Sequence, residues 1–233
     1  MLILAFETSA KAGSVALHDG FSLLGENYCN TGLTHSQTLM TMAEDLLKTC
    51  SLTPGDIEAV AVAAGPGSFT GVRIGVAAAK GFAWGRELPC YGVSTLEAMA
   101  LSLGAFEGYV CPVMDARRSQ VYNALFRAEK GQLTRISEDR AIALSDLAAE
   151  LRQLDAPIFL VGDGSTLTYN TLKPQLSQLV MPPEQHMHQR ASGVALAAAQ
   201  AIAKGAPGDG NSLTPNYLRL SQAERERLAR EQK

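Results

Sequence analysis

The sequence has no apolar run that reaches the roughly 20 residues needed to cross a bilayer. Its first residues, MLILAFETS, contain neither a basic leader nor a long apolar stretch of the kind found in signal peptides. The four cysteines are scattered and form no C-x-x-C pair, so we expect reduced thiols. A net charge of −3 argues against a broad nucleic-acid-binding surface. These absences predict a cytoplasmic protein that binds no membrane.

Apolar residues make up 46% of the 233 residues, enough for one large core or two smaller ones. The first part of the chain predicts an antiparallel meander followed by alternating helices and strands. Its turns include Asp19-Gly20, which suits a two-residue hairpin. This order is typical of a ribonuclease-H-like unit with a mixed sheet. The predicted strands are 2–8, 14–19, 22–29, 58–64 and 89–93, and the predicted helices are 35–50, 72–85 and 95–103.

From about residue 105 the pattern begins again more loosely, without a clear sequence repeat of the first part. The predicted strands here are 108–116, 120–127 and 156–164, and the predicted helices are 144–154 and 191–205. We therefore divide the chain into an N-terminal lobe (1–104), a C-terminal lobe (105–220) and a polar tail (221–233).

The segment GPGSFTG, residues 65–71, lies between a predicted strand and a predicted helix. Backbone N–H groups at the start of a helix can bind a phosphate. However, no lysine follows as in a P-loop, and Pro66 lacks an N–H group. The alternative is that Gly65, Gly67 and Gly71 allow positive φ angles and a close contact between helix and sheet. We favour the packing interpretation.

The longer string AGPGSFTGVRIG (64–75) resembles the hallmark of the TsaB (YeaZ) family. FETS (6–9), THSQTLM (34–40) and YGVSTLEAMA (91–100) are similar to other segments of that family, in the same order. MDARRSQVY (114–122) and PNYLR (215–219) resemble its later segments, with Gln120 where glutamate is usual. The resemblance covers most of the chain, and the glycine-rich string is its most specific part.

This resemblance implies an α/β fold of the ASKHA (actin-like ATPase, ribonuclease-H-like) class. The fold has two lobes, each with a mixed sheet and flanking helices, and the second lobe is degenerate. The family is required for threonylcarbamoylation of adenosine 37 in tRNAs that read ANN codons. Its members act as non-catalytic scaffolds for the paralogous transferase TsaD, together with the ATPase TsaE and downstream of TsaC. They form a homodimer when alone and meet tRNA only through the assembled complex.

The residues that would carry metal chemistry in TsaD differ here. TsaD has an N-H-x-x-x-H segment whose two histidines bind a metal, and in the similar segment of this chain Thr95 and Met99 stand at those positions. Neither side chain is a good ligand for such a metal. His186 and His188 lie in a proline-flanked stretch and do not form an equivalent pair. We expect no metal site.

Phosphoryl chemistry would involve the turn after the first strand. ATP-using members of the fold have an aspartate there, and this chain has Glu7 followed by Thr8 and Ser9. These hydroxyls could donate to a phosphate, but we favour a turn that only satisfies its own backbone. The candidate phosphate or nucleotide contacts are Glu7, Thr8, Ser9, Gly65, Gly67 and Ser68. No catalytic residue and no cofactor are expected. Weak nucleotide binding without efficient hydrolysis stays open, and any ATP or ADP site is expected only in the complex.

A stand-alone enzyme of the actin-like fold is the alternative function: a weak ATPase, a sugar-kinase-like enzyme or a peptidase-like enzyme. The sequence contains neither G-x-S-x-G nor H-E-x-x-H. His35 and Ser36 are sequence neighbours on a predicted helix, so they do not face each other. The absence of these catalytic motifs favours a scaffold over an enzyme.

The helix predicted at 72–85 is apolar on almost every side, so one face must contact something other than the sheet. That contact is either the second lobe or another chain, and the family resemblance favours another chain. Methionines such as Met42 suit adaptable contact surfaces. The candidate partner-interface residues are His35, Met42, Ile74, Ala78 and Phe82.

Overall fold

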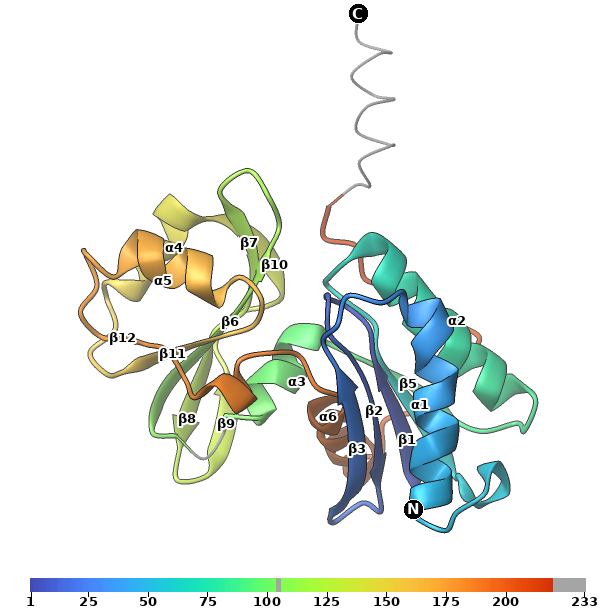
Figure 1. Cartoon of the computed structure of the whole chain (residues 1–233). Coiled ribbons are helices and arrows are strands. Elements are labelled where there is room, and N and C mark those ends of the chain that lie inside the picture. The colour runs from blue at the N-terminus through green and yellow to red at the C-terminus, as the bar shows by residue number, and fades with distance from the viewer. Residues whose placement is uncertain (104–105, 220–233) are drawn as a thin grey trace, which may run out of the picture.

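The computed structural model describes residues 1–103 and 106–219, which form two lobes side by side (Figure 1). The first lobe has a five-stranded sheet in the order β3-β2-β1-β4-β5. β1, β2 and β3 form an antiparallel meander, and β4 and β5 run parallel to β1. The strands are β1 (Ile3–Glu7), β2 (Gly13–His18), β3 (Leu23–Cys29), β4 (Ala59–Ala63) and β5 (Cys90–Val93).

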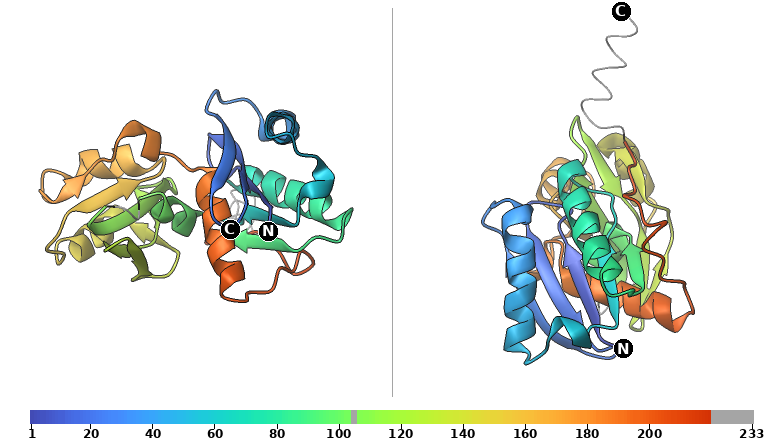
Figure 2. Two further views of the ribbon diagram at one scale, coloured as in Figure 1. Left: turned by 90° about the horizontal axis from the view of Figure 1, so that it is seen from below. Right: turned by 90° about the vertical axis from the view of Figure 1, so that its right-hand side faces the viewer.

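Helices cover both faces of this sheet (Figure 2). α1 (His35–Thr49) and α2 (Phe69–Trp84) pack on the face that carries Leu4 and Phe6. α6 (Ala191–Ala203) packs on the opposite face, which is built mainly from alanines of β1, β2 and β4. Because successive side chains of a strand point to opposite faces, β1 serves both layers and is fully buried.

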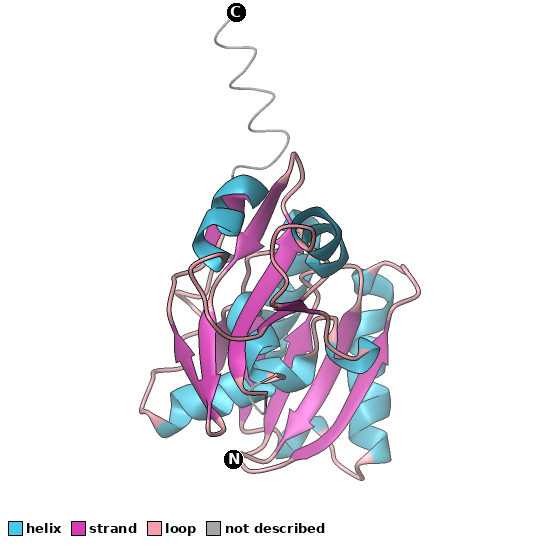
Figure 3. Ribbon diagram, turned by 90° about the vertical axis from the view of Figure 1, so that its left-hand side faces the viewer, coloured by secondary structure: helices cyan, strands magenta, loops and turns pink. Residues whose placement is uncertain are grey.

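The second lobe repeats the strand order and polarity of the first. Figure 3 shows the sheets in magenta with helices in cyan packed against them. Its sheet has the order β10-β7-β6-β11-β12, in which β6, β7 and β10 are antiparallel and β11 and β12 run parallel to β6. β8 and β9 extend it at one end. The strands are β6 (Gly108–Asp115), β7 (Gln120–Asn123), β8 (Phe126–Glu129), β9 (Gln132–Arg135), β10 (Arg140–Ala143), β11 (Ile158–Val161) and β12 (Leu179–Val180). The sequence shows no sign of this repeat.

One face of the second sheet is covered by helices of the same lobe. α4 (Leu144–Leu151) and α5 (Ser165–Leu172) cover that face. The other face packs on α3 (Thr95–Leu101), which also lies against α6. Short 3₁₀ turns stand at Pro54–Asp56 and Glu184–His186. α3 therefore joins the hydrophobic cores of the two lobes.

Pro112 explains why the predicted strand 120–127 is divided into β7 and β8. Both pieces pair with β6 in one continuous register, Asn123 opposite Val113 and Phe126 opposite Val110. Between them lies Pro112, which has no N–H group for the ladder. The side-chain amide of Asn123 donates instead to the carbonyls of Pro112 (3.1 Å) and Ala124 (2.9 Å).

The helix predicted at 191–205 corrects the predicted lobe boundary. α6 packs on the first sheet, although the sequence-based division at residue 104 assigned it to the C-terminal lobe. Its small side chains fit the alanine-rich face of the first sheet, and sequence periodicity does not identify which sheet an apolar helix covers. The predicted tail 221–233 lies outside the described residues.

Smaller differences concern element ends. The turn between β2 and β3 spans residues 19–22 rather than the two residues Asp19-Gly20. α2 begins at Phe69, three residues before the predicted start, because Ser68 caps it. β9, β10, β12 and α5 were not predicted.

In the part of the chain that the structure describes, no helix has the length and apolar character needed to cross a membrane.

Placing α6 in the first lobe generates a prediction. Ala195→Asp would bury a carboxylate against the first sheet, where Ala195 is fully buried. We expect it to lower the free energy of unfolding by about 3 kcal/mol or more. Gln200→Asp, on the exposed side of the same helix, should stay within about 0.5 kcal/mol of wild type. Urea denaturation followed by circular dichroism measures both, and equal stability of the two variants would contradict this placement of α6.

Candidate functional site

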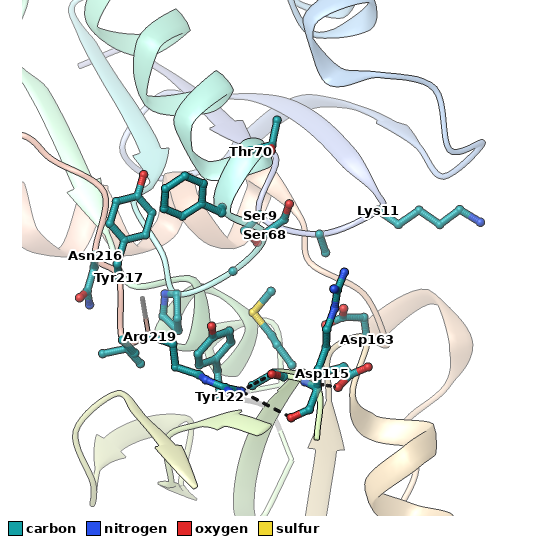
Figure 4. Close-up of a pocket in the computed structure, with 18 residues that line it drawn as sticks. Ser9, Lys11, Ser68, Thr70, Asp115, Tyr122, Asp163, Asn216, Tyr217 and Arg219 are labelled. Atoms are coloured by element: carbon teal, nitrogen blue, oxygen red, sulfur yellow. Dashed lines mark hydrogen bonds between the residues drawn. The ribbon is translucent and has the colours of Figure 1, made fainter. Parts of the chain in front are cut away.

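A cleft of about 640 Å³ lies between the lobes and is the candidate site (Figure 4). The first lobe contributes the turn after β1 and the loop before α2, and the second lobe contributes the end of β6 and the end of β11. A C-terminal segment closes one wall. The lining residues are 9–11, 66–70, 114–117, Tyr122, Asp163 and 216–219.

Close backbone contact holds the glycine-rich loop against the turn after β1. A Cβ atom on Gly71 would lie 2.1 Å from the carbonyl oxygen of Thr8, and one on Gly67 would lie 2.6 Å from that of Ser9. Ser68 N–H donates to the Ser9 carbonyl (2.6 Å), and the Thr8 hydroxyl donates to the Gly71 carbonyl (2.8 Å). The structure thus supports the packing interpretation of GPGSFTG.

The predicted positive φ angles are correct only at Gly65, where φ is +112°. A Cβ atom there would also lie 2.6 Å from the Asn216 carbonyl oxygen. Gly67 and Gly71 are not among the residues with positive φ. They are glycines because a neighbouring backbone passes too close for a side chain. Gly71 lies inside the first turn of α2, whose N-cap Ser68 accepts from its N–H group.

The six candidate phosphate contacts divide into two groups. Ser9, Gly67 and Ser68 line the cleft, whereas Glu7, Thr8 and Gly65 do not. Thr8 is fully buried and uses its hydroxyl on Gly71. Ser9 is also buried, and its hydroxyl has no hydrogen-bond partner among the described residues.

Glu7 is a fully buried acid at the end of β1. Its Oε1 accepts from the Ser9 N–H group (2.5 Å), while Oε2 has no partner in the described part of the chain. Burial raises the pKa of Glu7 to about 7, against the lowering effect of the hydrogen bond from the Ser9 N–H group, and the nearby carboxylate of Asp163 adds to the increase. Glu7 therefore lies within the first lobe rather than in the cleft.

Sequence reasoning missed Asp163, which follows β11 in the second lobe and lines the cleft. Burial raises its pKa, and the Asp115 carboxylate raises it further, while a hydrogen bond from the Gln189 side chain (3.0 Å) opposes the shift. The sequence analysis placed Asp163 at the end of the predicted strand 156–164, and nothing in the sequence indicated that its carboxylate would approach Glu7.

Cationic side chains also line the cleft. Lys11 and Arg117 line it from opposite lobes, and Arg219 reaches it from the C-terminal segment. Arg117, Arg118 and Ser119 have φ angles of 62°, 57° and 56°, three consecutive left-handed residues without a glycine. Each such residue costs about 1–3 kcal/mol, so other contacts must hold this turn.

The positions compared with the TsaD metal ligands, Thr95 and Met99, are both buried. Met99 belongs to the core between α3 and the second sheet. Within residues 1–103 and 106–219, no group of three or more His, Cys, Asp or Glu side chains is arranged to hold a metal ion.

The predicted partner-interface residues are half-buried rather than exposed. His35 contacts the Ala10 carbonyl through Nε2 (2.8 Å). Met42, Ile74, Ala78 and Phe82 pack against the first core. The outward stripe of α2 is formed instead by Arg73, Ala77, Gly81 and Trp84, the last with 84% of its surface exposed. We call these four residues the α2 stripe.

Comparison with known proteins decides the family. The family model for tRNA N6-adenosine threonylcarbamoyltransferase (TsaD) matches residues 30–226. The tRNA threonylcarbamoyladenosine biosynthesis protein TsaB of Bacillus subtilis is 34% identical over 226 residues, with 96% of each chain covered. The chain belongs to the TsaB family. The Escherichia coli TsaB protein is 38% identical over 70% of this chain and 72% of its own length.

The YeaZ structure from Pseudomonas aeruginosa shares the fold with a TM-score of 0.79 and 28% identity, over 93% of this chain and 99% of that one. Together with the repeated sheet order, this similarity confirms the predicted ASKHA class of this TsaB-family chain. This structural similarity also confirms the resemblance to the TsaB (YeaZ) family that was based mainly on AGPGSFTGVRIG (64–75).

Two glycines of α2 provide a matched pair of substitutions. Gly71→Ala places a Cβ atom against the Thr8 carbonyl, so we expect a loss of about 2 kcal/mol or more in the free energy of unfolding. Gly81→Ala meets no atom within 4 Å and should stabilise the helix by up to about 1 kcal/mol. Thermal melting measures both. Stabilisation by both substitutions would show that the close contact is not needed.

Glu7 predicts a specific pH dependence. Its pKa is raised from 4.5 to about 7, so the folded chain retains a proton that the unfolded chain releases. Its contribution therefore weakens the folded state as pH rises from 4.5 to 7 and is constant above 7. Relative to wild type, Glu7→Gln should gain about 3 kcal/mol between pH 4.5 and pH 8. Urea denaturation of both proteins across this range tests it; parallel curves would refute the raised pKa.

Proposed function

We propose that the chain is a non-catalytic scaffold subunit for formation of threonylcarbamoyladenosine at position 37 of tRNAs that read ANN codons. It acts with TsaD and TsaE, downstream of TsaC. Its membership of a family of tRNA threonylcarbamoyladenosine biosynthesis proteins supports the pathway. The observation that carries the scaffold role is the α2 stripe, an exposed surface in which the small residues Ala77 and Gly81 lie between Arg73 and the exposed Trp84.

The α2 stripe has the properties of a helix-packing surface. Ala77 and Gly81 let another helix approach closely, and Trp84 offers a large apolar anchor of the kind that dominates interface energies. α1 lies beside α2 and exposes 47% of Met40. The proposed occupant is the related lobe of TsaD in the complex, and a second copy of this chain when TsaD is absent.

The position of Glu7 supports a non-catalytic role. An acid that positions a cation and phosphates must face the cleft, whereas Glu7 is buried and bonded to the Ser9 backbone. In this proposal the chain has no cofactor or metal of its own, and ATP or ADP binds only in the complex. It works in the cytoplasm and meets tRNA only through the assembled complex.

A stand-alone enzyme of the actin-like fold, with weak ATPase, sugar-kinase-like or peptidase-like activity, is the second candidate. The cleft favours it, because Ser9, Ser68 and Lys11 line a space of about 640 Å³. The burial of Glu7 weighs against phosphoryl transfer there.

The scaffold role predicts the effect of a charge on the α2 stripe. Ala77→Glu would place an unpaired carboxylate in the interface, which costs several kcal/mol of binding, of order 2–5. We expect it to abolish co-purification with TsaD and to remove threonylcarbamoyladenosine from tRNA of cells that depend on the variant, as measured by mass spectrometry. The monomer should melt as the wild type does, because Ala77 is exposed.

Ala149→Glu is the matched control, since Ala149 is exposed on α4 of the other lobe. It should leave both the complex and the tRNA modification unchanged. An Ala77→Glu protein that retains both would place the interface elsewhere and weaken the scaffold proposal.

A further inference from the structure

The C-terminal segment 216–219, which we call the strap, contacts both lobes beside the cleft (Figure 4). On the first lobe its backbone is bonded to the end of β4: the Asn216 N–H group donates to the Ala64 carbonyl (2.7 Å). The Asn216 carbonyl lies against Gly65, where a side chain would not fit. The strap is thus attached to the glycine-rich loop.

Tyr217 attaches the strap to α2. Its ring stacks on Phe69 with 4.6 Å between centroids, and its hydroxyl accepts from Nε of Arg73 (2.7 Å). The Arg73 guanidinium also lies 3.9 Å from the centre of the Phe69 ring. Because Arg73 belongs to the α2 stripe, a partner seated on that stripe would contact the group that holds Tyr217.

Arg219 crosses to the second lobe. Its guanidinium donates to the carbonyls of Ala116 and Arg117, the latter at 3.5 Å. These carbonyls begin the left-handed turn 117–119, so the bonds hold a strained segment of the opposite lobe. Arg117 N–H also donates to the Asp115 side chain (2.7 Å), and the Ser119 carbonyl accepts from Leu144 N–H (3.1 Å).

Two further polar bridges join the lobes. One is the segment before α6, where Gln189 donates to Asp163 of the second lobe (3.0 Å) and Arg190 pairs with Glu26 of the first (3.0 Å). The other is built at α3. The Ser94 hydroxyl donates to Asp139 (2.5 Å), and Arg135 pairs with Glu97 (3.0 Å) and Asp139 (2.7 Å). α3 packs on both lobes and forms the joint between them. Loss of Arg219 would leave this joint and both cores intact.

We propose that the strap latches the two lobes at a fixed closure, with Arg219 as the latch, and that a partner bound on the α2 stripe acts on this latch through Arg73 and Tyr217. The latch concerns the isolated chain and stands without the proposed function. Only the action of a partner rests on the proposed function.

Distances between spin labels on the two lobes test the latch in the full chain. Labels are placed on Lys48→Cys in α1 and Ala149→Cys in α4, both exposed positions. Cys29 and Cys50 are replaced by serine, while Cys90 and Cys111 are buried and remain. Arg219→Ala should shift the distance distribution and broaden it, while a single cooperative melting transition shows that both lobes remain folded.

Arg86→Ala is the matched control. Arg86 lies just after α2, where its guanidinium contacts the carbonyl and the ring of Phe82 and not the strap. Its distribution should coincide with that of the parent protein. An Arg219→Ala distribution that also coincides with the parent would overturn the latch and leave lobe closure to α3 and the segment before α6.

Addition of TsaD tests the second half of the proposal. The labelled parent should change its distance distribution on binding TsaD, and Tyr217→Phe, which keeps the stacking but loses the bond from Arg73, should bind with a reduced change. An equal change in both proteins would overturn coupling through Tyr217. Failure of TsaD to bind either protein would overturn the proposed function and the coupling with it, while the result on the isolated chain would stand.

Discussion

Gly67, Gly71 and Gly75 lie in a line against the backbone and side chains of Thr8 and Ser9, and no side chain larger than hydrogen fits there. This contact fixes α2 directly on the turn after β1. The position of α2 in turn determines three other features of the first lobe. It sets the edge of the cleft, the outward direction of the α2 stripe and the surface of Phe69 on which the strap rests. A helix held only by apolar side chains would have more freedom to slide, because such packing tolerates repacking.

The two lobes have the same sheet order, but helices cover their two sheets in different ways. The first sheet is covered on both faces by helices, and three strands of it are buried throughout. One face of the second sheet packs on α3, which lies in the connection between the lobes. The lobes are therefore not independent, since α3 belongs to both cores. Their relative position is set by packing at this joint and by polar contacts across the cleft.

Periodicity and turn residues in the sequence predicted most elements and the packing role of the glycine-rich loop. They could not assign α6 to a sheet, because an apolar helix satisfies either one. They also gave the face of α2 only approximately. Ile74 and Phe82 prove half-buried, and Ala77 and Gly81 face outward. No local sequence pattern shows how the lobes meet. The burial of Glu7 and its approach to Asp163 depend on that arrangement, and so do the bonds that Arg219 makes to the second lobe.

The return of the chain to the first lobe affects how the protein is made. On a ribosome β1 emerges first, but the face of Ile3 and Ala5 stays uncovered until α6 has been synthesised. The second lobe, whose last strand ends at Val180, is complete before that. The usual order, in which an N-terminal unit finishes folding before the next one begins, is therefore reversed. During synthesis the first sheet carries an open apolar surface for the time needed to translate the whole second lobe, and it is in this interval that the nascent chain is most exposed to aggregation and to chaperones.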